Sequence, residues 1–320
     1  MKTTLFTYYI LCMALLVACS TDSDNYPSKN DVRYSDVAIE PTAAVTLPQT
    51  TRADFSGPVE LETFSPGSKI FGVTAFLGHE IPSSWEPNSR INFSPVDCSQ
   101  DGKYTFEELK YFPLDYKIYF YAFSPMVNCT FTEGTLTEHP KITYALTGRE
   151  DILWSKNESG IIKTENISEQ LQPNFLFEHK LQRVVFYVKR TADVAANTKI
   201  NAIRIHNLYN KATLDLITGK LTFDKTVAPV TLSATYDVTP TTDYQKYPYD
   251  IMFEPNVTNL SMTVEVNGTA YDKDITLAGA NAGKVGSKYE LQIIIDGTTV
   301  SINKPSIGEW IDVDNASGTI

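Results

Sequence analysis

The chain has 320 residues, 42% of them hydrophobic, and a formal net charge of −11. This length favours two domains of ordinary size, each with enough apolar residues for its own core. The acidic balance argues against nucleic acid as a partner, because phosphate binding needs clustered lysine and arginine. The 18 tyrosines and 16 phenylalanines favour strands over helices.

The first 18 residues have the features of a secretory signal. A basic start precedes an apolar stretch from Leu5 to Ala18, which is too short to span a membrane comfortably. The stretch ends in LVAC at residues 16–19, which resembles the bacterial lipobox, whose cysteine is acylated and becomes the first mature residue. We predict a signal peptide at 1–18 and lipidation at Cys19. The alternative is a plain signal peptide followed by a chance cysteine.

The residues after Cys19 indicate where a lipidated chain is delivered. Their sequence, STDSD, resembles the signal that sends lipoproteins of the Bacteroides group to the outer face of the outer membrane. Acyl chains anchor a protein stably without a spanning helix when two or more are present. We therefore expect a lipid-anchored precursor at the outer membrane and cell surface.

A polar segment connects this anchor to the globular part. Residues 20–51 are rich in Ser, Thr, Asp, Asn and Pro, a composition typical of a tether. Within it, Val37 and Ile39 alternate with polar or small residues, as do Val45 and Leu47, and alternation of this kind is typical of strands. We predict that residues 19–52 form a lipidated tether or propeptide with one or two strands.

The rest of the chain reads as short strands separated by turns. Residues 117–123, 183–190 and 261–266 each place alternate apolar side chains on one face, so each is expected to bury one face of a sheet. An Asn-Gly at 267–268 and an Asp-Gly at 296–297 accept the positive φ angles of tight hairpins. No long segment has a helical period, and the pattern predicts an all-β fold.

Two β-sandwiches fit the length and the number of strands. A polar stretch from Asn157 to Gln172 precedes a strong new strand, which places a break near Pro173. We therefore predict an N-terminal β-sandwich at 53–172 and a C-terminal β-sandwich at 173–320.

Motifs for catalysis or metal binding are missing from the sequence. None of the four histidines has metal-ligand spacing to another, and no nucleophile elbow, phosphate loop or dinucleotide fingerprint occurs. The sequence predicts no enzyme, no cofactor and no metal site. Trp85 and Trp154 are candidates for stacking on sugars, although aromatic residues in strands more often belong to a core.

Two cysteines remain once Cys12 leaves with the signal peptide and Cys19 takes the lipid. Cys98 and Cys129 can form one disulfide in an exported protein, or they can remain two thiols. The sequence leaves both readings open.

The linear order of several motifs resembles the Bacteroides-type fimbrillins, the subunits of the type V pilus. The resemblance runs from about residue 52 to residue 313. The segments that carry it are TRADF, SKIFGVTAF, WEPNSRINF with DGKYTF, YKIYFYAFSP, DILWSK, FLFEHKLQRVVFYV, ATLDLITGKL, GSKYELQIII and IGEW. Each segment is weak alone, and their common order carries the resemblance.

The resemblance implies two tandem transthyretin-like β-sandwich domains and a mechanism of assembly. In this family the precursor travels to the surface as a lipoprotein, and a trypsin-like protease then cuts after Arg or Lys, removing the lipid and the first strand. The exposed groove accepts a strand from the next subunit. We expect the cut between Arg52 and Ala53. Lys29 and Arg33 compete, but cuts there would leave the strands around 37–47 in place.

The resemblance also implies a donor strand near the C-terminus. The two candidate segments are Thr298 to Ile302, centred on Val300, and Trp310 to Val313. Only ten residues follow Trp310, so stalk, tip and anchor roles stay open. The expected partners are other fimbrial subunits, the surface protease, the outer membrane and a host or glycan ligand. The alternative is an uncleaved surface lipoprotein, either a pilus anchor or a glycan-binding module.

Overall fold

The computed structural model is all-β, as the sequence predicts. It describes residues 32–46, 69–78, 81–82, 85, 91–99, 103–161, 172–277, 282–297, 299–303 and 306–309. Within these ranges the chain forms strands, turns and irregular segments but no helix. The described residues therefore include no helix long and apolar enough to cross a membrane.

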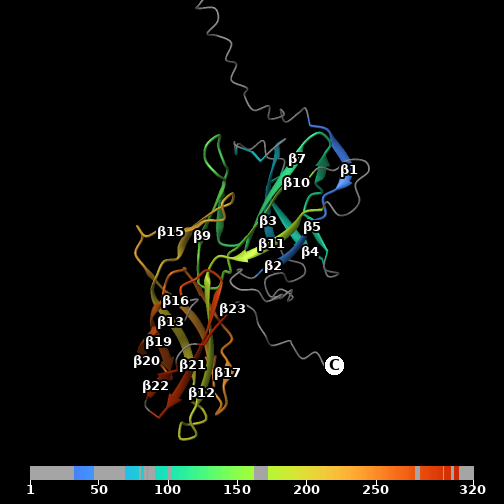
Figure 1. The fold of residues 1–320 in the computed structure, drawn as a ribbon. Coiled ribbons are helices and arrows are strands. Elements are labelled where there is room, and N and C mark those ends of the chain that lie inside the picture. The colour runs from blue at the N-terminus through green and yellow to red at the C-terminus, as the bar shows by residue number, and fades with distance from the viewer. Residues whose placement is uncertain are drawn as a thin grey trace, which may run out of the picture.

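A seven-stranded sheet forms the centre of the first half of the molecule (Figure 1). Its strands, in spatial order, are β2 (Thr42–Thr46), β11 (Asn174–His179), β10 (Leu153–Ile161), β7 (Lys117–Ser124), β3 (Lys69–Gly78), β4 (Ile91–Cys98) and β5 (Tyr104–Phe106). All neighbours are antiparallel except β2 and β11, which run parallel. A separate two-stranded sheet pairs β1 (Tyr34–Ala38) with β6 (Tyr111–Pro113).

Strand β7 is buried on both faces, whereas the sequence pattern predicted one buried face. Ile118 and Phe120 belong to a core cluster on one side of the sheet. Tyr119 and Tyr121 belong to a second cluster on the other side. Successive side chains of a strand point to opposite faces, so a central strand covered on both sides has no solvent-facing position. The tyrosines of this strand are therefore core residues.

The sheet that covers the second cluster draws strands from both halves of the chain. Its strands, in order, are β15 (Leu221–Phe223), β14 (Lys211–Asp215), β9 (Lys141–Ala145) and β8 (Cys129–Thr132), all antiparallel. The pairing of β14 with β9 extends from Lys211 opposite Ala145 to Asp215 opposite Lys141. A hairpin from the second half thus completes the first sandwich.

The second sandwich encloses a single core cluster between two sheets. One sheet has the order β17 (Gln245–Lys246), β12 (Gln182–Arg190), β21 (Ser287–Asp296) and β22 (Thr299–Ile302), with β18 (Ile251–Phe253) on β12 and β23 (Ser306–Glu309) on β21. The other has the order β16 (Val230–Val238), β13 (Ile200–Leu208), β19 (Asn259–Val266) and β20 (Thr269–Thr276). The predicted tight turn is present between β19 and β20, where Asn267 and Gly268 both have positive φ.

The strand pairing divides the chain differently from the predicted ranges 53–172 and 173–320. Strand β11 lies beyond residue 172 but pairs with β10 and β2 of the first sandwich. Its Phe175 and Phe177 are fully buried against Phe71. The second sandwich begins only with β12. The hairpin of β14 and β15 comes after β13 in the chain but pairs with β9 of the first sandwich. The chain therefore enters the second sandwich, returns to the first, and then completes the second.

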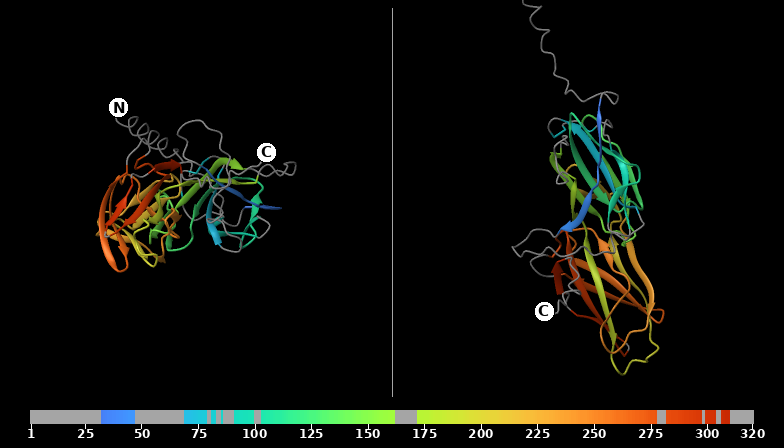
Figure 2. Two further views of the ribbon diagram at one scale, coloured as in Figure 1. Left: turned by 90° about the horizontal axis from the view of Figure 1, so that it is seen from below. Right: turned by 90° about the vertical axis from the view of Figure 1, so that its right-hand side faces the viewer.

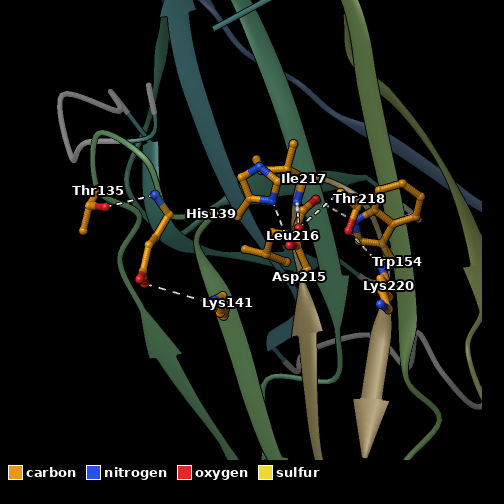
Figure 3. Close-up of polar contacts among 10 residues, drawn as sticks. Thr135, His139, Lys141, Trp154, Asp215, Leu216, Ile217, Thr218 and Lys220 are labelled. Carbon is orange, nitrogen blue, oxygen red and sulfur yellow. Dashed lines mark hydrogen bonds and ion pairs between the residues drawn. The ribbon is translucent and has the colours of Figure 1, made fainter. Parts of the chain in front are cut away.

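The hairpin turn is fixed by a small polar network, drawn in Figure 3. One carboxylate oxygen of Asp215 accepts hydrogen bonds from the backbone N–H groups of Ile217 and Thr218, at 3.0 and 2.9 Å. The other lies 2.7 Å from Nδ1 of His139, which precedes β9. Asp215 therefore both caps its own turn and ties the turn to the first half of the chain.

Trp154 packs over the same turn from β10. Its Nε1–H donates to the carbonyl of Leu216 at 2.7 Å. Gly219 takes a φ of +66°, and a Cβ there would lie within 2.5 Å of the Trp154 ring. Only glycine combines this backbone angle with so close an approach. Lys180 connects β11 to β12, and its ammonium lies 4.5 Å from the centre of the Trp154 indole ring.

Replacing Asp215 with Ala should weaken folding in a pH-dependent way. Burial raises the pKa of Asp215, but the hydrogen bonds from Thr218 and His139 outweigh this and leave the pKa below its ordinary value of 3.8. The native state therefore binds fewer protons than the unfolded state, so the stabilisation is complete above about pH 4 and is lost as the pH falls through the native pKa. We expect Asp215→Ala to lower the free energy of unfolding by about 1–3 kcal/mol at pH 5.

Urea unfolding at pH 5 and at pH 3 measures this difference. The difference in the free energy of unfolding between the wild type and Asp215→Ala should be smaller at pH 3 than at pH 5. The exposed Asp243 provides a control, since Asp243→Ala should change stability little at either pH. A gap that is as wide at pH 3 as at pH 5 would contradict the role of the ionised carboxylate.

Candidate functional site: the groove filled by the N-terminal strands

Residues 32–46 are folded into the first sandwich, although they precede the predicted cleavage at Arg52. We call this segment the N-terminal strap. It contains β1 and β2, and Figure 2 shows it in blue along the length of the first sandwich. The structure has strands near the two positions where the sequence predicted them, with β1 near Val37 and β2 over residues 42–46.

The first part of the strap pairs with β6. Strand β1 is antiparallel to it, with Tyr34 opposite Pro113 and Ala38 opposite Tyr111. Two further backbone hydrogen bonds extend the pairing: the Leu114 N–H donates to the carbonyl of Arg33 at 3.0 Å, and the Ile39 N–H donates to that of Lys110 at 2.8 Å.

The second part of the strap covers the edge of the seven-stranded sheet. Strand β2 runs parallel to β11, with register pairs from Thr42 opposite Asn174 to Thr46 opposite Glu178. The Thr42 N–H donates to the carbonyl of Pro173 at 2.9 Å, and its hydroxyl hydrogen-bonds the Asn174 side chain at 3.0 Å. Without β2, the outer backbone groups of β11 would have no strand beside them.

Apolar side chains of the strap complete the core on its side of the sheet. Ile39 is 4% exposed and Val32 is 9% exposed, and both belong to the same cluster as Phe112 and Phe175. Val37 and Ala43 pack against this cluster while half-buried. The other aromatic members of the cluster are Phe71, Phe106, Phe120 and Phe177. Loss of the strap would expose part of this aromatic core to water.

Polar contacts hold the strap at its beginning and at its bend. The guanidinium of Arg33 binds both carboxylate oxygens of Asp115, at 2.9 and 3.1 Å. At the bend between β1 and β2, the side chain of Gln172 accepts from the Glu40 N–H at 2.8 Å and donates to the carbonyl of Ala38 at 3.1 Å. The two hydrogen bonds of Gln172 therefore go to the backbone of the strap, on both sides of the bend.

The residues of the predicted processing sites are placed only in part. Cys19, Lys29, Arg52 and Ala53 lie outside the described residues. Arg33, the competing site, lies beside β1, and its carbonyl is bonded to the backbone of Leu114. A protease binds its substrate as an extended, unpaired strand, so this pairing disfavours cutting at Arg33 in the folded chain.

The first of the two donor-strand candidates lies at the edge of the second sandwich. Val300 and Ile302 belong to β22, which pairs antiparallel with β21 of the same chain. Val300 is only 2% exposed and is part of the second core. Strand β23 continues along the same edge of β21. Thr298, Trp310 and Val313 lie outside the described residues.

Cys98 and Cys129 do not form a disulfide. Cys98 ends β4 and lies in the core cluster beneath the strap. Cys129 begins β8 and packs against the cluster on the opposite side of the seven-stranded sheet. The sheet separates the two thiols. The sequence left both a disulfide and two free thiols open, and the structure has two thiols.

The two tryptophans considered for sugar stacking are core residues. Trp85 and Trp154 are 7% and 6% exposed, and both belong to the cluster between the seven-stranded sheet and the β8, β9, β14, β15 sheet. Neither presents a ring face for a glycan. Among the described residues, no group of three or more His, Cys, Asp or Glu side chains is arranged to hold a metal ion.

The sequence profile of the fimbrillin-like family matches residues 51–310. The chain belongs to the fimbrillin-like family. The matched range begins just before Arg52, so the strap lies ahead of the part that the family profile describes. No curated protein sequence matches the chain significantly.

Three solved structures share the fold of this fimbrillin-like chain. A fimbrial protein from Bacteroides vulgatus is 15% identical with a TM-score of 0.55, covering 85% of this chain and 99% of its own. A candidate cell adhesion protein from Bacteroides uniformis is 20% identical with a TM-score of 0.59, covering 86% and 98%. Another from Bacteroides ovatus is 16% identical with a TM-score of 0.57, covering 88% and 99%.

Shortening Ile39 tests whether the strap belongs to the core. We expect Ile39→Ala to lower the free energy of unfolding of the uncut chain by about 2–4 kcal/mol, because it removes buried methylene groups and leaves a cavity against the aromatic cluster. Denaturant unfolding measures the change. Asp36→Ala, at an exposed position of β1, is the matched control and should change stability by less than about 0.5 kcal/mol. An Ile39→Ala effect as small as that of the control would contradict the account.

Proposed function

We propose that this fimbrillin-like chain is the precursor of a fimbrial subunit with a role in adhesion at the cell surface. In this proposal the chain is exported as a lipoprotein acylated at Cys19 and reaches the outer membrane. A trypsin-like surface protease then cuts after Arg52, and the new N-terminus is Ala53. The subunit joins its neighbours by donor-strand exchange. Membership of the fimbrillin-like family supports the fimbrial role.

The observation that carries the proposal is the position of the strap. It fills a groove between β6 and β11 and completes the apolar core beneath them. A cut after Arg52 would separate the whole strap from the rest of the chain. The groove would then offer unpaired backbone groups and apolar pockets, which are the two features that bind an added strand.

The donor would come from the C-terminal end of another subunit. Withdrawing β22 would expose Val300 and break its pairing with β21, at a cost to the second core. The segment from Trp310 to Val313 carries apolar residues and follows β23 in the chain, so its use would leave the pairing of β22 with β21 in place. We favour a donor that contains this later segment, with Trp310 and Val313 among its apolar side chains.

A role in adhesion is supported by the kind of proteins that share the fold. The similar structures from Bacteroides species are a fimbrial protein and candidate cell adhesion proteins. Such a role needs no active site, and the sequence contains no catalytic motif. The host or glycan ligand would bind elsewhere than at Trp85 and Trp154, because both are buried.

One alternative is favoured by a specific observation. With its strap in place the chain already has a closed core, so it needs no donor strand to be stable. An uncleaved chain that keeps its lipid would act as a pilus anchor or as another surface-binding lipoprotein. The two functions differ in the N-terminus of the mature protein.

Substituting Arg52 tests the proposed processing. On cells that make the protein, the wild-type chain should begin at Ala53 and occur in high-mass polymers. Arg52→Ala should retain acylated Cys19 and fall by at least about tenfold in the polymer fraction, because the strap stays covalently in its groove. Intact mass and N-terminal analysis of the surface fraction measure both.

Lys29→Ala provides the matched control, since it removes a competing basic residue and keeps the ion pair of Arg33. It should leave the Ala53 terminus and the polymers unchanged. A wild-type surface form that begins only at acylated Cys19 would refute the proposed processing and favour the anchor.

A further inference from the structure

The strap is bound through two strands that belong to different sheets. Strand β1 pairs with β6 in a two-stranded sheet, whereas β2 pairs with β11 at the end of the seven-stranded sheet. A short bend at Ile39, Glu40 and Pro41 joins them. The strap is therefore a bidentate ligand of the groove, with two binding segments on one peptide.

We infer that cleavage after Arg52 does not by itself open the groove. The strap stays bound as a non-covalent peptide, and it leaves only when a segment long enough to occupy both β11 and β6 displaces it. This inference rests on the proposed function, because it concerns the step after the proposed cut. It assigns a partner of defined form: a bent, extended segment of about 15 residues from a second subunit.

The contacts that hold residues 32–46 in the described part of the first sandwich all survive the cut. The bonds to β6 and β11, the Arg33 ion pair and the Gln172 bridge all involve residues 32–46, which lie ahead of Arg52. The cut removes only the covalent link to the rest of the chain. Retention then depends on these contacts alone.

Two linked binding segments hold better than either alone. When one segment separates from its strand, the short bend keeps it at a high effective concentration near its site, so rebinding competes with escape. Gln172 adds to this because it bonds to the backbone on both sides of the bend, at Glu40 and at Ala38. A competitor that covers only one edge would leave the other half of the strap in place.

The position of the cut gives displacement a direction. The β1 half, which brings the buried Val32 and Ile39, lies far from the new chain end at Arg52. The β2 half lies nearer to that end. Exchange should therefore begin at β11 and end at β6.

The incoming segment must match the pairing directions and the buried positions of the strap. It must run antiparallel to β6 and then parallel to β11. It needs large apolar side chains at the places of Val32 and Ile39, and a small one at the place of Ala43. The backbone contacts of Gln172 impose no side-chain requirement at the bend.

A site-specific nick tests retention and displacement directly. The full-length chain is made with the recognition sequence of a site-specific protease inserted between Arg52 and Ala53, and it is cut to completion. Gel filtration with mass spectrometry then shows whether the strap co-elutes with the remainder. We expect co-elution under native conditions and release in denaturant.

Competing peptides then define the partner. A labelled peptide of residues 32–46 should displace the strap, whereas peptides of residues 32–40 and 41–46 should need at least tenfold higher concentrations. A scrambled 15-residue peptide is the control. Gln172→Ala in the nicked chain should speed release about tenfold, because two hydrogen bonds at the bend are lost.

Loss of the strap on the first column would overturn the inference, as would a half-length peptide that displaces it as well as the full one. An unchanged release rate in Gln172→Ala would likewise contradict binding at the bend. None of these results depends on natural processing. Failure of the proposed function would instead appear as native fimbriae that contain no chain beginning at Ala53, whatever the nicked protein does.

Discussion

The first sandwich depends on one constraint: the edge of β11 and the aromatic core beside it must be covered. Backbone N–H and C=O groups at an uncovered edge pair with any available strand, and an exposed apolar groove binds any suitable apolar segment. The strap meets both demands at once, with β2 along β11 and with Val32 and Ile39 in the core. The proposed export and later assembly would require a cover of this kind, one that can be exchanged for another strand.

The β14 and β15 hairpin imposes a second constraint, on the relation between the two sandwiches. Its residues follow β12 and β13 in the chain, yet it pairs with β9 and packs under Trp154. The first sandwich therefore cannot unfold without disturbing a hairpin that the second half of the chain supplies. The groove that is proposed to open during assembly lies in a sandwich whose far side is held by the hairpin, through Asp215, His139 and the turn at Gly219.

The sequence predicted the features that local patterns determine. Alternation and turn dipeptides were enough for the all-β fold, and the alternating apolar residues around Val37 predicted strands ahead of Arg52. Partner choice could not be predicted in the same way. The parallel pairing of β2 with β11 joins segments about 130 residues apart, and nothing in either segment specifies the other.

Three expectations depended on contacts between segments that are far apart in the sequence. Strand β7 was expected to bury one face because its pattern cannot show a second covering sheet, which here arrives partly from residues 211–223. Strand β11 was assigned to the second domain because the polar stretch before Pro173 looks like a linker. Cys98 and Cys129 were a plausible pair by compartment alone, but the seven-stranded sheet lies between them.

The most direct test of the account is to determine which segment lies along β11 in assembled fimbriae, by electron cryomicroscopy of the native polymer. The account predicts a strand from the next subunit beside residues 174–179, and no density for residues 42–46 of the same chain. A polymer in which residues 42–46 still occupy that edge, joined to the rest of their own chain, would contradict it.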